Sequence, residues 1–164
     1  MPGVGKSTVG REIAKRLDLP FADCDKVIER DVGYSIASLF ESQGEQAFRD
    51  LESRTLVSLV DQGPSVIATG GGTVLRDANR ELLRSRTRCV YLQAAPAFLW
   101  KRLRRDRRRP LLQVADPKAR LYELSDAREP LYRDTATIVL NVESLPFDRI
   151  VDSVLARLDA EPNR

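Results

Sequence analysis

The stretch Gly3-Val4-Gly5-Lys6-Ser7-Thr8 stands immediately before a run of residues with helical periodicity. It matches the second half of the phosphate-loop motif G-x-x-x-x-G-K-[ST]. Glycines in such a loop let backbone N–H groups turn toward phosphate oxygens, and the N-terminus of the next helix adds its positive dipole. The stretch therefore predicts a phosphate-binding site. A glycine turn in which Ser7 or Thr8 caps the helix is the structural alternative.

The motif also predicts a role for each of its side chains. The backbone of residues 3–5 would wrap the phosphates, and Lys6 would reach the outer ones. Ser7 would offer its hydroxyl to a magnesium ion, while Thr8 would touch an inner phosphate. A nucleotide and Mg²⁺ are therefore the expected ligands of this loop.

The motif is incomplete at its start. Its first glycine would lie five positions before Gly5, ahead of Met1, and the buried strand that normally precedes a phosphate loop has no counterpart in this sequence. We expect either that the start was assigned too late or that the chain was truncated, with Met1 an internal residue of a longer protein. Without that strand, lost packing and unpaired ladder groups predict low stability and weak nucleotide affinity.

The rest of the chain alternates between strand-like and helix-like segments. Short runs rich in β-branched or aromatic residues predict buried strands at residues 19–23, 65–69, 88–92 and 137–142. Helical periodicity predicts helices at residues 6–17, 45–60, 79–85, 96–105, 117–127 and 147–158. Because parallel neighbours need crossover connections, this alternation predicts an α/β fold whose parallel sheet is covered by helices on both faces.

Composition excludes several classes of protein. At 164 residues, with 42% hydrophobic and 31% charged residues, the chain has the size and composition of one globular domain. Histidine is absent, which excludes Ser-His-Asp and Cys-His catalysis, and two cysteines cannot complete a four-ligand zinc site. Cys24 and Cys89 lie far apart in the sequence, as is typical of reduced thiols. With neither a signal peptide nor a membrane-spanning run in the sequence, we expect a cytoplasmic protein.

Two carboxylates, Asp23 and Asp25, follow the first predicted strand. On an extended segment, residues two apart point to the same side. That arrangement suits a metal contact by one carboxylate and a substrate or base role for the other. The structural alternative is that an aspartate caps the next helix, and the pair alone does not decide between the two.

Two arginines and a glycine run are the candidates for binding an acceptor. The run Gly70-Gly71-Gly72 closes the second predicted strand, at the carboxyl edge where open α/β sheets bind ligands. A flexible turn is the alternative. Arg49 lies on an amphipathic helix, where the structural alternative is a solvated arginine paired with Glu45 or Glu52. Arg128 follows another predicted helix, where it could contact the C-terminal dipole.

The most basic stretch of the chain is residues 101–109, which carries a net charge of +6 from seven basic residues and Asp106. Nucleic-acid binding is the general interpretation of such a run. In a chain with a phosphate loop we favour a lid, because a mobile arginine can neutralise charge on a transferring phosphoryl group. The whole chain carries only +3, so its basic character is confined to this segment.

Taken in this order, the segments resemble bacterial shikimate kinases over essentially the whole chain. The resemblance implies a phosphate-loop kinase of the nucleoside-monophosphate-kinase type, in one domain over residues 1–164. It also implies a parallel sheet of strand order 2-3-1-4-5, a substrate-binding segment at about residues 24–53 and a lid at about residues 105–117. Strand 1 is the one missing from this sequence. Because strand 1 is central, we expect the sheet to be split between strands 3 and 4.

For the nucleotide, the resemblance implies that residues 3–8 form the binding loop and that Arg102 flanks the adenine. Arg109 matches the lid arginine that reaches ATP and the transferred phosphate. Ser7 and Asp23 match the magnesium positions. Cys24 stands where a small hydroxylated residue is common in the family, a departure that we expect to be tolerated.

For the acceptor, the resemblance implies that Arg49 and Arg128 clamp the carboxylate of shikimate. Asp25 matches the family's carboxylate that holds the shikimate hydroxyls, and it is the candidate catalytic base. The glycines at residues 70–72 match the triglycine contact to the substrate. Catalysis would then rest on positioning and on charge neutralisation by magnesium, Lys6 and the lid arginine.

The implied activity is phosphorylation of the shikimate 3-hydroxyl by ATP, giving shikimate 3-phosphate and ADP for aromatic amino acid biosynthesis. The resemblance also implies a monomer, with no nucleic-acid or membrane partner. One alternative is a kinase of the same fold for another small hydroxylated acid such as gluconate. A nucleotide- or nucleic-acid-binding regulatory module is the alternative from a different class.

Overall fold

The computed structural model describes residues 1–104 and 113–160 of the chain. Its strands are β1 (Phe21–Asp23), β2 (Val66–Ala68), β3 (Val90–Gln93) and β4 (Ile138–Asn141). Its α-helices are α1 (Lys6–Leu17), α2 (Cys24–Val32), α3 (Ile36–Asp61), α4 (Asp77–Arg86), α5 (Pro96–Leu103), α6 (Pro117–Thr135) and α7 (Phe147–Ala160). A short 3₁₀ helix, η1 (Thr73–Leu75), lies between β2 and α4. The order confirms the predicted alternation of strands and helices.

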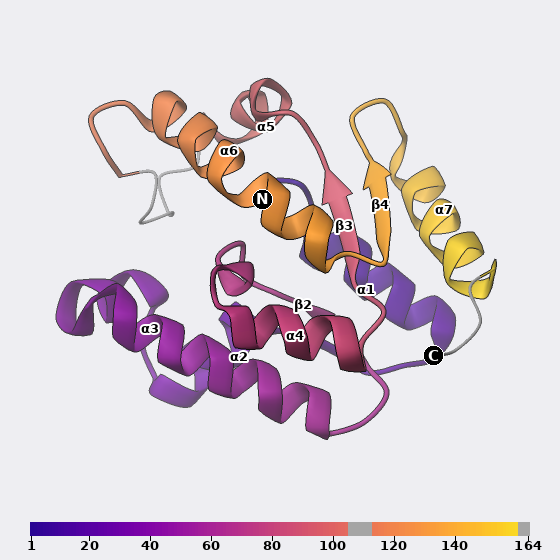
Figure 1. Ribbon diagram of the computed structural model, residues 1–164, viewed down its shortest axis with the longest axis horizontal. Helices are drawn as coiled ribbons and strands as arrows, with labels where there is room; N and C mark the ends of the chain where they lie inside the picture. Colours follow the sequence, from indigo (N-terminus) through magenta and orange to yellow (C-terminus); the bar gives the residue numbers. More distant parts are fainter. Residues whose placement is uncertain (105–112, 161–164) are drawn as a thin grey trace.

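The strands form two separate parallel pairs, β1 with β2 and β3 with β4 (Figure 1). In the first pair Ala22 lies opposite Ile67, and in the second Tyr91 lies opposite Val139. These pairs are the 2-3 and 4-5 neighbours of the expected order, and the break falls between them. The expectation of a sheet split at this point is therefore confirmed.

The largest differences from the predicted helix bounds are in α3 and α6. The helix expected at residues 45–60 is the second part of α3, which begins at Ile36 and bends at Gly44, where φ is 80° and ψ is 173°. The helix expected to end at residue 127 continues through Pro130 to Thr135. Arg128 therefore lies inside α6, and its expected position after a helix is wrong. Packing explains the difference, because the buried residues of α6 recur at helical spacing on both sides of the proline.

The main hydrophobic core lies around β3 and β4. Its members come from α1, α5, α6 and α7, and they include the fully buried Leu99, Leu121 and Val151. Met1 and Val4 are buried in the same core, at 3% exposure each. The segment before α1 is therefore anchored by apolar packing as well as by the turn of the phosphate loop.

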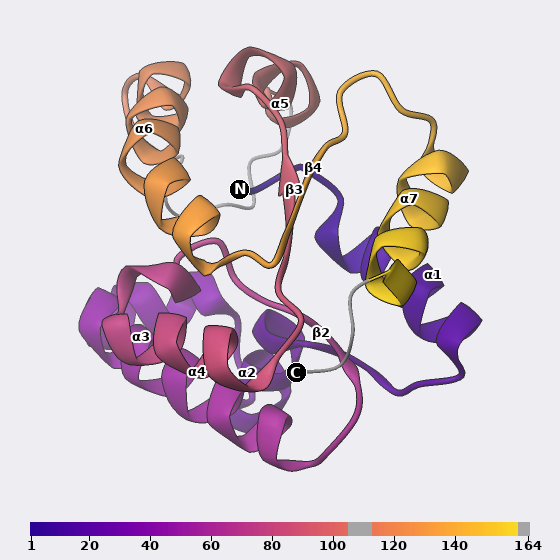
Figure 2. The ribbon, with the colours of Figure 1, turned by 45° about the vertical axis from the view of Figure 1, so that its right-hand side comes forward.

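The other strand pair has smaller cores of its own. Cys24, Leu56 and Leu83 join β1 and β2 to helices α3 and α4. Ile28 and Leu39 belong to a further cluster that packs α2 against the first part of α3. Figures 1 and 2 show α2, α3 and α4 grouped on one side of the molecule, away from α1 and α7. The substrate-binding segment expected at about residues 24–53 falls within this group.

Within the described ranges 1–104 and 113–160, no helix is long and apolar enough to cross a membrane.

Candidate active site

The phosphate-loop motif forms a tight turn that leads into α1. Gly3 and Gly5 have φ values of 75° and 99°, a region of backbone conformation that favours glycine. Gly5 is the N-cap of α1 and makes no side-chain capping bond, so the first N–H groups of the helix face the loop. The Lys6 ammonium donates to the Met1 carbonyl oxygen at 3.0 Å, across the mouth of the turn. The geometry fits the predicted phosphate cradle.

Asp23 links the phosphate loop to the next helix. Its Oδ2 accepts a hydrogen bond from the Ser7 hydroxyl at 2.5 Å, and its Oδ1 accepts from the backbone N–H of Asp25 at 3.1 Å. Asp23 therefore caps α2, as the structural alternative predicted, and also places a carboxylate oxygen beside the Ser7 hydroxyl. The expectation that Asp23 and Asp25 share an extended segment is wrong, because the chain enters α2 at Cys24.

Asp25 lies in the first turn of α2, beside the triglycine run. A methyl group on Gly70 would come within 3.1 Å of the Asp25 Oδ1 atom. Burial, followed by the negative charges of Asp23 and Glu52, raises the pKa of Asp25 to about 6, although the charge of Lys6 acts in the opposite direction. A carboxylate tuned toward neutral pH and adjacent to a phosphate loop suits a general base.

Gly70 and Gly72 are required by space rather than by unusual backbone angles, since no glycine of the run has a positive φ. A methyl group on Gly70 would clash with the carboxylate of Glu52, and one on Gly72 would clash with the guanidinium of Arg49. The turn after β2 is therefore covered by charged side chains from α2 and α3. This close contact favours the ligand-site interpretation over a flexible turn.

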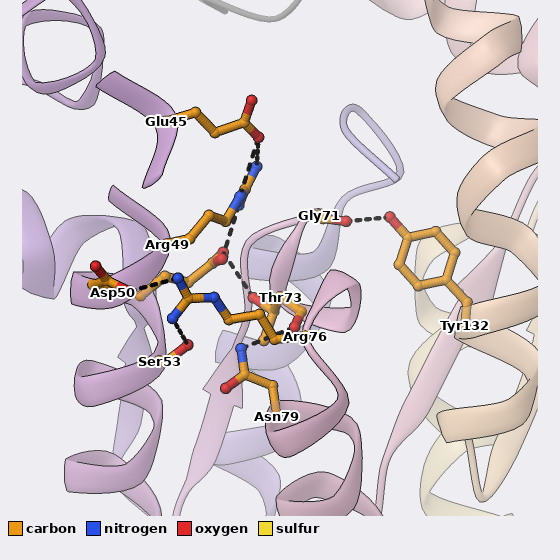
Figure 3. Close-up of polar contacts among 10 residues, drawn as sticks. Glu45, Arg49, Asp50, Ser53, Gly71, Thr73, Arg76, Asn79 and Tyr132 are labelled. Atoms are coloured by element: carbon orange, nitrogen blue, oxygen red, sulfur yellow. Dashed lines mark hydrogen bonds and ion pairs between the residues drawn. The ribbon is translucent and has the colours of Figure 1, made fainter. Parts of the chain in front are cut away.

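Arg49 is buried, at 6% exposure, so it is not the solvated arginine of the structural alternative. It does pair with both acids that this alternative named: Arg49 Nη1 contacts Glu52 at 2.8 Å and Arg49 Nη2 contacts Glu45 at 2.9 Å. Glu52 is 1% exposed and also accepts from the Thr73 hydroxyl at 2.8 Å (Figure 3). The Asn79 amide in turn donates to the Thr73 carbonyl at 3.0 Å. This network joins α3 to η1 and α4.

Arg128 reaches the middle of the glycine run from α6. It is 4% exposed, and a methyl group on Gly71 would lie 3.6 Å from its Nη1 atom. Tyr132, one turn further along α6, donates a hydrogen bond to the Gly71 carbonyl at 2.5 Å (Figure 3). The structure therefore brings Arg49, Arg128 and Asp25 together around one turn, although they come from three different helices.

Sequence reasoning assigned no site role to Glu52, Thr73 or Tyr132. Glu52 was visible as an acid three residues after Arg49, a spacing that allows a contact on a helix. The contacts of Thr73 and Tyr132 depend on packing between distant segments, which local patterns do not reveal. Their hydroxyls are buried in the structure, where a polar group requires a partner.

Of the two regions expected to cover the nucleotide, the structure describes Arg102 on α5 and only part of the lid. Arg102 is exposed on α5, with its guanidinium 5.7 Å from the Phe98 ring centre. The neighbouring Leu103 packs on the phosphate loop, since a methyl group on Gly3 would lie 2.8 Å from its side chain. Arg109 and most of the expected lid, residues 105–112, lie outside the described residues.

The ends of β1 and β2 lead into Asp23 and the glycine run, so the phosphate loop and the arginine–carboxylate cluster share the carboxyl edge of parallel strands. This arrangement, in an α/β fold, is that of a phosphate-loop kinase.

Comparison with known proteins identifies the family. The family model for shikimate kinase matches residues 2–159, so the chain belongs to the shikimate kinase family. A shikimate kinase from Paracidovorax citrulli is 50% identical over 145 residues, covering 87% of this chain and 79% of that protein.

Solved structures agree in fold. The structure of shikimate kinase from Acinetobacter baumannii in complex with shikimate has a TM-score of 0.94 and 36% sequence identity, covering 99% of this chain and 90% of that one. A gluconokinase from Sinorhizobium meliloti 1021 has a TM-score of 0.56 at 18% identity, covering 96% of this chain and 87% of that one. The second likeness extends to the fold alone.

We predict that Gly72→Ala destabilises the protein by about 1 to 3 kcal/mol, because the new methyl group must displace the buried Arg49 guanidinium. Gly71→Ala is the matched control, since its nearest neighbours would be the Tyr132 hydroxyl at 3.5 Å and Arg128 at 3.6 Å, which are ordinary contacts. Urea unfolding of both variants measures the difference. Equal losses in the two variants would contradict the assigned contact.

A second prediction concerns Asp25 and stability. Because the pKa of Asp25 is raised from 3.8 to about 6 on folding, its contribution to stability is present at low pH and is lost as pH rises toward 6. Asp25→Asn removes this loss. The gain in unfolding free energy of Asp25→Asn over wild type is expected to grow by about 2 kcal/mol between pH 4.5 and 7.5.

Urea unfolding at both pH values checks this prediction. Asp31→Asn, an exposed change on the same helix, serves as the control and should show little pH-dependent difference from wild type. A constant gain across this pH range would show that Asp25 ionises normally in the folded protein.

Proposed function

We propose that this protein transfers the γ-phosphoryl group of ATP to the 3-hydroxyl of shikimate, producing shikimate 3-phosphate and ADP. The observation that carries the proposal is the convergence of Arg49, Arg128 and Asp25 on the turn at residues 70–72, next to the phosphate loop. Membership of the shikimate kinase family and the likeness to a relative solved in complex with shikimate support it.

The acceptor side fits a carboxylate with several hydroxyl groups. Two buried guanidinium groups, one beside Gly72 and one beside Gly71, provide charged donors for a carboxylate. The pair formed by Arg49 and Glu52 keeps its guanidinium in one orientation, which limits the entropy lost when an anion binds. In this proposal Arg49 and Arg128 hold the shikimate carboxylate, and residues 70–72 contact the ring hydroxyls.

Asp25 is the proposed base. Its carboxylate orients the 3-hydroxyl and accepts its proton as the oxygen bonds to the γ-phosphorus, and the bond from that phosphorus to the bridging oxygen of ADP breaks. The raised pKa of Asp25 favours proton acceptance near neutral pH. Lys6 stabilises negative charge on the outer phosphates, which grows at the bridging oxygen during transfer.

The loop and Asp23 offer a fitting site for Mg²⁺. The Ser7 hydroxyl and the Asp23 carboxylate are adjacent oxygen donors, and Mg²⁺ in kinases commonly takes one or two protein ligands together with phosphates and water. Among the residues described here, no three histidine, cysteine or acidic side chains cluster as a metal site, so the nucleotide would complete the coordination. Bound Mg²⁺ would neutralise phosphate charge. Ser7 and Asp23 would hold it.

The remaining nucleotide contacts follow the family pattern. Residues 3–8 would bind the phosphates, with Thr8 on an inner phosphate. Arg102 would flank the adenine, and Arg109, in the lid at about residues 105–117, would reach the transferred group. The single domain, the monomeric state and the cytoplasmic location stay predictions.

A coupled assay of ADP release tests the proposed activity. We expect ADP release to depend on shikimate, with little ADP released when gluconate replaces shikimate or when no acceptor is added. Release with gluconate alone would favour the related-kinase alternative. Salt-dependent binding of DNA without shikimate-dependent ATP consumption would favour a nucleic-acid role for the basic stretch at residues 101–109.

We predict that Asp25→Asn lowers kcat by about 10²- to 10⁴-fold, because it removes the proton acceptor. Its dissociation constant for ATP should stay close to that of wild type. Lys6→Ala should also lose phosphoryl transfer, through weaker stabilisation of the phosphate charge. Asp31→Asn is the surface control and should retain activity. If Asp25→Asn turned over at the wild-type rate, Asp25 would not be the catalytic base.

The pH profile provides an independent check on Asp25. In the wild type, kcat/KM with shikimate should rise with pH through about 6 as the carboxyl of Asp25 loses its proton. The residual activity of Asp25→Asn should lack this acidic limb. Steady-state rates between pH 5 and pH 8 measure both profiles, and an identical limb in the variant would assign it to another group.

A further inference from the structure

The Tyr132 hydroxyl is hydrogen-bonded to Gly71, the middle residue of the glycine run. Tyr132 is 8% exposed on α6, and its hydroxyl donates to the Gly71 carbonyl at 2.5 Å (Figure 3). The Met1 sulfur lies 3.7 Å from the same hydroxyl, and the Arg128 guanidinium is a further polar neighbour that acts to lower the pKa of Tyr132. A hydroxyl has one proton to donate, and a carbonyl oxygen is a stronger acceptor than a thioether sulfur. The bond to Gly71 therefore sets the position of this hydroxyl.

The ring of Tyr132 is itself held in place. It stacks on the Tyr91 ring from β3, with the ring centres 5.0 Å apart and the planes inclined by 28°. The Tyr91 hydroxyl donates to Glu129 at 3.1 Å, and the Gln93 amide donates to the same carboxylate at 2.7 Å. The hydroxyl of Tyr132 thus reaches the glycine turn from a rigid support formed by β3 and α6.

The three carbonyl groups of the glycine run have different kinds of partners. Gly70 accepts from the Thr73 N–H at 3.3 Å and Gly72 from the Leu75 N–H at 2.9 Å, both within the local turn. Gly71 accepts from a side chain that lies 61 residues away in the sequence. Of the hydrogen bonds to this run among the described residues, only this one fixes the turn to another part of the fold.

A peptide unit between two glycines rotates at little steric cost, because neither residue has a Cβ atom. The unit is planar and trans, so its carbonyl oxygen and the next N–H point in opposite directions and rotate together. The bond from Tyr132 to the Gly71 carbonyl therefore also sets the direction of the Gly72 N–H, which points away from Tyr132.

We propose that Tyr132 is a positioning residue: its hydroxyl holds the Gly71–Gly72 peptide so that the Gly72 N–H faces the acceptor. The inference rests on the proposed function, because it assigns the glycine run to acceptor binding. Tyr132 does not touch the acceptor in this proposal. It acts through the backbone of the turn, and it reduces the ordering that acceptor binding would otherwise require.

The position of the turn matters because Arg128 lies close to it on the same helix as Tyr132. Arg128 lies one turn before Tyr132, and its Nη1 would be 3.6 Å from a methyl group on Gly71. By holding the turn, the Tyr132 hydroxyl therefore also sets the distance between the turn and Arg128, the proposed carboxylate-binding residue. A loosened turn would lose alignment with Arg128, and acceptor binding should suffer more than nucleotide binding.

Tyr132→Phe tests the proposal, because it removes the hydroxyl and leaves the stacked ring. The expected result is a rise of about 5- to 20-fold in the KM for shikimate, with the KM for ATP changing less than about twofold. Amide hydrogen exchange in a peptide covering residues 70–73 should become faster. Incorporation of para-aminophenylalanine at position 132, which restores an N–H donor, should recover the wild-type KM.

Tyr91→Phe is the matched control. It removes the other hydroxyl of the same ring pair, which contacts Glu129 and not the glycine turn. We expect this variant to leave the KM for shikimate and the exchange at residues 70–73 nearly unchanged. Circular dichroism and melting curves of both variants confirm that the comparison is made between folded proteins.

The outcomes distinguish the positioning role of Tyr132 from the proposed function. If wild type shows shikimate-dependent ADP release and Tyr132→Phe leaves the KM for shikimate unchanged, the positioning role is overturned and the proposed function stands. Equal changes in both KM values, or equal effects of the two variants, would also overturn it. Absence of shikimate-dependent release in wild type would instead overturn the proposed function and this inference with it.

Discussion

The site depends on one buried carboxylate, that of Glu52. At 1% exposure its charge has lost nearly all contact with water, so it must be compensated by close partners. Arg49 and the Thr73 hydroxyl provide this compensation, and they come from different elements. The carboxylate thereby ties α3 to the turn after β2. Removing Arg49 would leave an unpaired buried charge, and removing the Thr73 hydroxyl would leave one carboxylate oxygen without its hydrogen bond, so the geometry of the turn and the stability of α3 are linked.

Charge accounts for the shape of the turn as well as for its chemistry. The carboxylate of Glu52 covers Gly70 and the guanidinium of Arg49 covers Gly72, so the backbone lies closer to charged groups than any side chain would allow. Burial is the main cause of the raised pKa of Asp25, and the negative charges of Asp23 and Glu52 add to it. Glu52 therefore both shapes the glycine turn and contributes to the raised pKa of the proposed base.

Sequence patterns predicted the parts of the molecule that depend on local chemistry. The phosphate loop, α1 and the four strands follow from glycine spacing, apolar periodicity and β-branched runs, and the structure confirms them. The break in the sheet was also predictable, because it follows from the strand order that the family resemblance implied. The burial of Arg49 was not predictable, because its sequence neighbours form an amphipathic pattern in which an arginine is usually exposed to solvent. The continuation of α6 through Pro130 was missed as well, because packing on both sides of the proline outweighs its local effect.

Each strand pair has one cysteine next to its first strand. Cys24 follows β1 and is fully buried, while Cys89 precedes β3 and its carbonyl accepts from Thr137 and Ile138 at the start of β4. Burial raises the pKa of Cys24 to about 12 and that of Cys89 to about 11, so both thiols are protonated at neutral pH and react slowly with alkylating agents in the folded chain. Alkylation of each thiol then reports the opening of its own strand pair. The protein therefore contains a separate chemical probe for local unfolding in each half of its divided sheet.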